Sequence, residues 1–468
     1  MSPRNIATNP PAHPHPNARR AAGRRTELSW PDALPLFPPL PEEARSLLTR
    51  LPEALHQVRP LQTTHKRSLP EDVAALSQRL TRERAWLSRP YWSHPAAVSA
   101  YLHYFLPWNL VRLTRLLASL PLPDPRTSGP KRALFLDMGS GPLTLPLALW
   151  LARPQWRSAP ISVLALDNSP QPLQLGRALM EALAALTGFP LWPIRTVRAP
   201  LWKATQHAAV LVDKGDMRPW LISAANVLNE AMETRSRRRI GEDHAEMDND
   251  ETAHDVVMDR TQAAEDDTLD MRLDNLLDSL APFLEWPESA NVHGTPWPAL
   301  LFVEPGTRLG GGTIMRLRRL AVEGGLTILA PCTHQDACPL QRSRTWCHFT
   351  FTCEGAPAWL TQLSARAGLA KDSLSLSPLL ISAPASRLRN DNRQCVRVLS
   401  SPLRVPGLRG KARYACSAQG LFLLEDAEKL ACGDLLPASP GGQRDHKSGA
   451  RIARPALKIP GHSPGRDK

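Results

Sequence analysis

The chain has 468 residues, with 57 Lys and Arg against 44 Asp and Glu, 47 prolines and seven cysteines. At roughly 100–200 residues per domain, this length predicts two to four domains. Proline is about twice as frequent as the average of roughly 5%, which indicates linkers or tails. The longest apolar run, Leu143–Ala152, is far shorter than the roughly 20 residues that span a bilayer, so we expect no transmembrane helix and no membrane partner.

Residues 1–40 are predicted to form a disordered basic arm. The first 26 residues contain five arginines and five prolines but no acid, and they lack the apolar stretch of a signal peptide. A cleaved organellar transit peptide is the alternative. Residues 41–128 are expected to form a helical N-terminal domain, whose aromatic-rich segment Trp86–Leu117 packs against the next domain. A base-stacking surface is the alternative for that segment.

Short apolar runs alternate with helical stretches over residues 129–345, and this pattern predicts a doubly wound α/β domain with a parallel sheet. Gly241–Asp270 contains twelve acids and one arginine, so residues 231–275 are predicted to be a disordered acidic insertion. A small β-rich domain is expected over residues 346–432, followed by a disordered basic tail over 433–468. The expected strands of the α/β domain are Ala133–Asp137, Ile161–Asp167, Pro193–Val197, Trp220–Asn226, Ala299–Glu304 and Leu326–Ala330.

A glycine-rich turn follows the first expected strand of the α/β domain. The strand ends at Asp137, and Gly139-Ser-Gly141 leads into a helix, while the second strand ends at Asp167. Glycines let backbone amides approach a ligand, and an acid at the second strand can bind ribose hydroxyls. The third glycine of the dinucleotide motif is absent, which favours S-adenosylmethionine over NAD; a scaffold without a ligand is the alternative. Asn226, at the end of the fourth strand, completes the candidate cofactor-binding residues.

All seven cysteines lie between Cys332 and Cys432, an odd number that indicates a reduced compartment and a local metal site. Cys332, Cys338 and Cys347 share one loop, and we choose Cys416 as the fourth ligand because its strand would join two domains. Four thiolates fit zinc or a [4Fe–4S] cluster. The Cys338-Pro339 pair and the wide spacings favour iron–sulfur, and unligated buried thiols are the alternative. The other candidates for the fourth ligand are His334, His348, Cys353, Cys395 and Cys432.

The formal net charge of +13 is unevenly distributed. Outside the acidic stretch a large excess of bases remains, which predicts a polyanionic partner, most commonly nucleic acid. The segment Ala385–Ala415 has eight bases and one acid, so we expect it to bind a phosphate backbone; a solvated face is the alternative. DNA is a weaker candidate than RNA. The proposed RNA-binding residues are Arg387, Arg389, Arg393, Arg397, Arg404, Arg409, Lys411 and Arg413.

Several motifs together resemble the methyltransferase-like proteins of the mitochondrial small ribosomal subunit and their bacterial relatives. The resemblance implies a class I methyltransferase fold and a [4Fe–4S] cluster on the four chosen cysteines. It also implies association with small-subunit ribosomal RNA during assembly or translation. We expect a monomer, located in the cytoplasm of a bacterium or in the mitochondrial matrix of a eukaryote. The matching motifs are Leu136–Pro142, Ala225–Glu230, Val303–Thr307, Ala330–His334, Ala337–Leu340 and Trp346–Phe349.

Whether the chain transfers methyl groups stays open at this point. Enzymes that methylate an exocyclic amine often carry Asn/Asp-Pro-Pro-aromatic after the fourth strand, where this chain reads Asn226-Val-Leu-Asn-Glu230. The sequence therefore names no catalytic residue. The alternative function is an active S-adenosylmethionine-dependent RNA methyltransferase with a structural zinc site.

Overall fold

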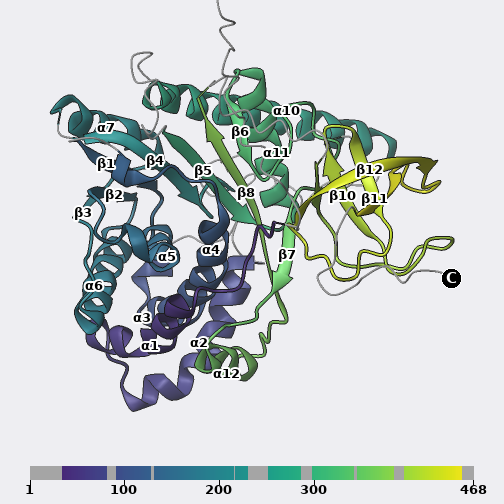
Figure 1. The fold of residues 1–468 in the computed structure, drawn as a ribbon. Helices are drawn as coiled ribbons and strands as arrows, with labels where there is room; N and C mark the ends of the chain where they lie inside the picture. The colour runs from purple at the N-terminus through teal and green to yellow at the C-terminus, as the bar shows by residue number, and fades with distance from the viewer. Residues whose placement is uncertain are drawn as a thin grey trace, which may run out of the picture.

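The computed structural model describes residues 34–81, 91–127, 131–215, 217–229, 251–285, 298–341, 345–383 and 395–455. Three parts are visible: an N-terminal group of helices, a central sheet flanked by further helices, and a small C-terminal barrel (Figure 1). The described residues contain no helix whose length and apolar character would let it cross a membrane.

The N-terminal helices pack together against one side of the central sheet (Figure 1). Their aromatic side chains point inward: the Tyr104 hydroxyl donates to the Leu369 carbonyl at 3.2 Å, and Trp108 Nε1 donates to Ser364 Oγ at 3.0 Å. Both contacts reach α12 (Ala358–Arg366) or the turn after it. For these aromatics the packing interpretation is confirmed. The helices are α1 (Glu42–Val58), α2 (Thr63–Thr81), α3 (Pro95–Ala100) and α4 (Leu106–Ser119).

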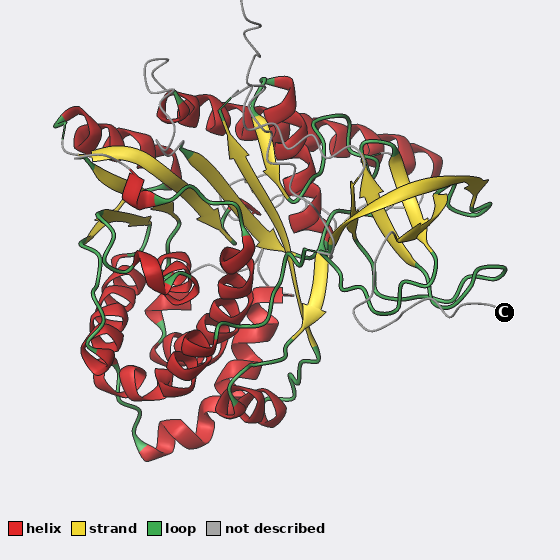
Figure 2. Ribbon diagram, viewed as in Figure 1, coloured by secondary structure: helices red, strands yellow, loops and turns green. Residues whose placement is uncertain are grey.

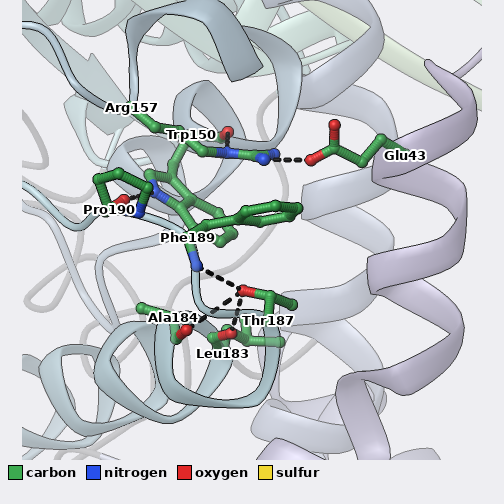
Figure 3. A network of polar contacts seen from close by, with 8 residues as sticks. All are labelled: Glu43, Trp150, Arg157, Leu183, Ala184, Thr187, Phe189 and Pro190. Atoms are coloured by element: carbon green, nitrogen blue, oxygen red, sulfur yellow. Dashed lines mark hydrogen bonds and ion pairs between the residues drawn. The ribbon is translucent and has the colours of Figure 1, made fainter.

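A buried arginine joins α1 to the sheet domain. Figure 3 shows Arg157 paired with Glu43 of α1, while Arg157 Nε donates to the Trp150 carbonyl at 3.1 Å. The guanidinium carbon lies 4.2 Å from the ring centroid of Trp150 and 4.5 Å from that of Phe189. The two aromatic faces thus offset part of the hydration that the guanidinium loses on burial.

The central sheet has strand order β3-β2-β1-β4-β5-β8-β6, with β7 paired to β8. Strands β1 to β5 are parallel, whereas β8 runs antiparallel between β5 and β6. This order is that of a class I methyltransferase, so the predicted doubly wound α/β fold is confirmed. The strands are β1 (Arg132–Met138), β2 (Ile161–Asp167), β3 (Ile194–Arg198), β4 (Met217–Ala225), β5 (Ala299–Pro305), β6 (Thr327–Ala330), β7 (Phe349–Thr352) and β8 (Ser373–Ser382).

Helices cover both faces of the sheet (Figure 2). One core contains the apolar sides of α4, α5 (Thr144–Ala152) and α6 (Pro170–Thr187). The other contains those of α7 (Ala204–Asp213), α10 (Glu251–Leu280) and α11 (Arg308–Glu323). Two separate apolar faces explain why the strands are apolar along almost their whole length.

The predicted acidic insertion is not disordered throughout. Residues 251–275 belong to α10, and residues 230–250 lie outside the described part of the chain. Arg316 of α11 pairs with Asp266 and Asp270 at 2.7 and 3.1 Å, and Arg319 pairs with Asp270 at 2.5 Å. The prediction gave weight to the acids and missed the apolar positions of the last turns, Leu273, Leu276, Leu277 and Leu280, which are buried.

The C-terminal domain also differs from the prediction. Strands β7 and β8 belong to the central sheet, and the separate unit is a closed barrel, β10-β11-β13-β12-β9. Residues 435–455 of the supposed tail provide two of its strands, whereas 456–468 lie outside the described residues. Prolines and glycines within β12 hid the strand pattern. The barrel strands are β9 (Cys395–Val398), β10 (Arg413–Ser417), β11 (Gly420–Leu424), β12 (Leu435–Arg444) and β13 (Arg451–Pro455).

The end of the predicted basic arm is ordered, while residues 1–33 lie outside the described chain. Leu34 bridges to Leu435 of β12, and the Phe37 ring stacks on Phe351 at a centroid distance of 4.1 Å. Arg115 of α4 donates to the carbonyls of Pro38, Phe37 and Thr352 at 2.7, 2.8 and 2.6 Å. This segment therefore links the barrel, the sheet and the N-terminal helices.

Candidate functional site

The glycine turn after β1 is held against the end of β2. Gly139 and Gly141 have φ of 66° and 53°, a region that side chains with Cβ rarely adopt. The Gly141 amide donates to Asp167 Oδ2 at 2.9 Å. A Cβ on Gly139 would lie 2.4 Å from Val227 Cγ2, in the segment after β4. Gly139 therefore admits no side chain, and Gly141 has the positive φ that glycine favours.

The two predicted acids lie at the carboxyl ends of neighbouring strands but in different surroundings. Asp137 is only 1% exposed and accepts hydrogen bonds from Ser140 Oγ and Ser223 Oγ, both at 2.5 Å. Burial raises the pKa of Asp137 to about 7. Asp167 is half-buried, and burial raises its pKa while amides of Ser169 and Gly141 lower it. Each Asp167 oxygen accepts one of these bonds and has a second lone pair with which it can accept another.

Gly176 of α6 supports the same turn, and sequence reasoning missed it. A Cβ at this position would lie 2.2 Å from the Pro142 carbonyl carbon and 2.8 Å from the Leu143 nitrogen. The helix therefore approaches the turn more closely than any other residue would allow. An isolated glycine inside a helical pattern was the only available signal.

The segment containing Asn226 is fixed by a second residue that the sequence analysis did not propose. Asn226 has φ of 58°, and its amide donates to the Val303 carbonyl at 2.8 Å. Glu304 is 1% exposed, and its Oε1 accepts from the amides of Val227 and Leu228 at 3.0 and 2.9 Å. Glu304 Oε2 accepts from Asn229 Nδ2 at 2.8 Å. The Glu-Pro-Gly motif thus shapes the sheet edge next to the glycine turn.

The four chosen cysteines line one pocket, although they come from two parts of the fold. Cys332, Cys338 and Cys347 leave the edge of the central sheet, and Cys416 lies on β10 of the barrel. His334, one of the alternative ligands, lines the same pocket. The seven cysteines, all of them among the described residues, form no disulfide.

The remaining cysteines lie apart from this pocket. Cys353 Sγ donates to the Lys371 carbonyl at 3.0 Å, and Cys432 Sγ donates to the Leu399 carbonyl at 3.0 Å. Cys395 is buried at the start of β9. The ring of His348 stacks on Trp346, and its Nδ1 lies 3.1 Å from the Trp346 carbonyl oxygen. These contacts give each of the four side chains a local packing role.

Burial makes the thiols of the pocket poor acids in the absence of a cation. It raises the pKa of Cys338, Cys347 and Cys416, and the neighbouring thiols raise these pKa values further. A positively charged metal centre reverses this effect because it binds the thiolate form and displaces the protons.

The backbone around the pocket is closely packed on α11. A Cβ on Gly311 would lie 2.7 Å from the Cys347 carbonyl oxygen, and the Cys347 amide donates to Met315 Sδ at 3.2 Å. Arg318 Nε donates to Cys332 Sγ at 3.1 Å. One helix thus positions two of the four cysteines.

The proposed RNA-binding residues divide into three groups. Arg397 and Arg413 are 7% and 8% exposed and donate to backbone carbonyls, so their assignment to an RNA-binding surface was wrong. Arg397 lies between the core residues Val396 and Val398 and therefore faces away from the barrel core, toward the Pro331 carbonyl of the sheet domain, whereas Arg413 donates to the Ala427 carbonyl within the barrel. Arg404, Arg409 and Lys411 are exposed in the loop between β9 and β10. Three more, Arg387, Arg389 and Arg393, lie outside the described residues.

Residues 225–357 match the family model described as "Mitochondrial small ribosomal subunit Rsm22". The resemblance predicted from the sequence is confirmed. The matched segment contains the end of β4, the Glu-Pro-Gly motif and the loop with three of the four cysteines. A comparison of the sequence with curated proteins gives no match.

Three solved methyltransferases are similar to the chain at TM-scores of 0.25–0.26. They are a precorrin-6y C5,15-methyltransferase from Geobacter metallireducens (12% identity, 58% of this chain and 84% of that one), a type I restriction-modification methyltransferase subunit from Streptococcus thermophilus (11%, 60% and 44%), and a geranyl diphosphate methyltransferase in complex with GPP and sinefungin (10%, 64% and 86%). Scores this low carry no argument, and the fold assignment rests on the strand order.

Proposed function

We propose that the chain is a small-ribosomal-subunit factor that binds ribosomal RNA and carries a [4Fe–4S] cluster on Cys332, Cys338, Cys347 and Cys416. The observation that carries the proposal is the pocket lined by all four thiols, three of which lie in the Rsm22 match. The description of that family as a mitochondrial small-subunit protein supports ribosome association. The described part of the chain holds this pocket between the sheet domain and the barrel.

The sequence spacing of the cysteines favours a cluster over a single zinc ion. Five residues separate Cys332 from Cys338 and eight separate Cys338 from Cys347, which is wider than the paired cysteines of a zinc ribbon. Pro339 follows Cys338 as it does in ferredoxin-type loops. When bound, the cluster would supply a one-electron redox centre and would join the barrel to the sheet domain.

Anaerobically purified protein is expected to contain about four iron atoms per chain, with the visible absorption of a [4Fe–4S] cluster. Cys332→Ser and Cys416→Ser should each lose most of this iron, because a hydroxyl is a weaker ligand for iron than a thiolate. Cys353→Ser is the matched control, since its thiol bonds to the Lys371 carbonyl outside the pocket. Retention of full iron content by both ligand variants would contradict the assignment.

S-adenosylmethionine is the proposed ligand of the glycine turn. The half-buried Asp167 carboxylate can accept bonds from two ribose hydroxyls, and no atom lies within 4 Å of the position that a Cβ on Gly141 would take, so the turn is open at that point. The glycine turn and Asp167 also favour the second candidate function, an active RNA methyltransferase with a structural zinc site. Transfer of tritiated methyl groups to 16S ribosomal RNA, lost in Asp137→Ala, together with one zinc per chain and no iron, would establish that alternative.

The exposed barrel loop is the proposed contact with the RNA backbone. Each phosphate contact contributes about 0.7–0.9 to the slope of log affinity against log salt. Arg404→Gln with Arg409→Gln is therefore expected to reduce this slope by about 1.5 and to weaken binding to small-subunit RNA at low salt. The control is Arg45→Gln with Arg50→Gln on α1, where both arginines pair with glutamates. Equal salt slopes for the two double variants would exclude the loop as a contact with the RNA backbone.

A further inference from the structure

Two buried arginines face the four cysteines from different parts of the fold. Arg318 is 4% exposed and lies on α11 beside the sheet, whereas Arg397 is 7% exposed and lies on β9 of the barrel. Arg318 Nε donates to Cys332 Sγ at 3.1 Å, and Arg397 is the ladder partner of Cys416 on the neighbouring strand β10. The pocket therefore has a fixed positive charge on each of its two domain walls.

Both arginines also hold the backbone of the cysteine loop. Arg318 Nη2 donates to the carbonyls of His334 and Asp336 at 3.1 and 2.7 Å, and its Nε donates to Cys332 Sγ. Arg397 Nε donates to the Pro331 carbonyl at 2.9 Å, and Nη1 donates to the Gly433 carbonyl at 2.8 Å. The loop is thus clamped from the sheet side and from the barrel side.

Within the described residues, neither guanidinium forms an ion pair with a carboxylate. Carbonyls accept from these N–H groups but do not neutralise their charge, and Asp434 acts electrostatically on Arg397. Burying a charge without a counter-ion is costly. The thiols are the groups that can provide the missing negative charge.

We propose that Arg318 and Arg397 are the counter-ions of the metal centre and set its reduction potential. This inference rests on the proposed cluster. Four thiolates and an oxidised [4Fe–4S] core of charge 2+ sum to 2−, which the two guanidinium groups balance. Uptake of one electron from an external reductant takes the core to 1+ and the assembly from neutral to 1−, with no proton transferred. The two arginines therefore make the cluster easier to reduce than it would be with uncharged side chains at these positions.

Removal of one guanidinium should make the cluster harder to reduce. At a fixed potential, the ratio of reduced to oxidised cluster is expected to fall at least tenfold in Arg318→Gln and in Arg397→Gln. For a one-electron couple, a tenfold change corresponds to a shift of 59 mV toward lower potential. Arg318→Lys and Arg397→Lys retain the charge and should shift the ratio much less.

The test is a dithionite titration of anaerobic full-length protein, monitored by electron paramagnetic resonance and combined with iron analysis. Arg413→Gln is the matched control, because Arg413 is a buried barrel arginine that donates to the carbonyls of Ala427 and Ser400. It should leave the potential unchanged. Circular dichroism of each variant verifies that the fold is intact.

The possible outcomes distinguish the counter-ion role of the two arginines from the presence of the cluster. If the protein holds iron but the Gln variants keep its potential and iron content, the counter-ion inference is wrong and the cluster stands. If the Gln variants lose iron that the Lys variants retain, the charge is what matters and the inference is supported. Loss of iron from both the Gln and the Lys variants would show that the two arginines act only as structural residues, and it would contradict the counter-ion inference. Protein without iron would overturn the cluster itself.

Discussion

Gly176→Ala is expected to destabilise the protein by about 3 kcal/mol and to abolish S-adenosylmethionine binding. The added Cβ would lie 2.2 and 2.4 Å from the carbonyl carbon and oxygen of Pro142. These are backbone atoms of the turn, so no rotamer change relieves the overlap. Either α6 or the Pro142–Leu143 backbone must move, and a movement of that backbone disturbs the turn that holds the Gly141 amide against Asp167.

Urea unfolding and calorimetric titration with S-adenosylmethionine measure the two effects of this change. Gly312→Ala is the matched control, since Gly312 also lies inside a helix but has no atom within 4 Å of the position that an added methyl group would take. There the methyl group should be neutral or should stabilise the helix by up to about 1 kcal/mol. Equal stabilities and equal affinities for the two variants would contradict the close approach of α6.

The fold followed from the sequence wherever one physical signal dominated. The strands of the central sheet are apolar runs because both faces of the sheet are covered, and the expected and observed ranges agree closely. Strand β12 was missed because Pro437 and Pro440 interrupt the pattern, yet both pair with neighbours in the barrel ladders. A closed barrel tolerates such positions through register shifts that composition does not indicate.

The candidate sites show the same division between local and long-range information. Cys332, Cys338 and Cys347 are close in the sequence, so their loop could be predicted, and Cys416 followed from the expectation of a link between two domains. Arg318 and Arg397 could not be assigned, because a base near a thiol pocket and a base on the surface have the same local sequence context. Only the three-dimensional structure separates Arg397, which is buried, from Arg404, which is exposed.

Helix α11 connects the two candidate sites. Thr313 Oγ1 donates to Asn229 Oδ1 at 2.9 Å, and Asn229 donates to Glu304, which shapes the sheet edge beside the glycine turn. Five residues later on the same helix, Arg318 binds the cysteine loop. A shift of this helix would therefore alter the sheet edge beside the glycine turn and the thiol pocket together, which gives a physical basis for coupling between the two candidate sites.

The stability of the protein is expected to fall, relative to Asp137→Asn, as the pH rises from about 4 to about 7. Burial raises the pKa of Asp137 from 3.8 in a solvated chain to about 7 in the fold. Between these values the folded state binds a proton that the unfolded state has lost, so unfolding becomes easier as pH increases. Below pH 4 both states are protonated, and above pH 7 the full cost of the buried charge is present.

Urea unfolding of both proteins between pH 4 and pH 8 measures this difference. The stability of Asp137→Asn relative to the native chain should increase across that interval by at most about 4 kcal/mol, at about 1.4 kcal/mol for each pKa unit, and then level off. Asp445→Asn is the control, because hydrogen bonds from Ser448 lower the pKa of that exposed carboxyl. A constant difference between Asp137→Asn and the native chain would show that Asp137 is ionised throughout. In that case Ser140 and Ser223 would stabilise the carboxylate by more than burial disfavours it.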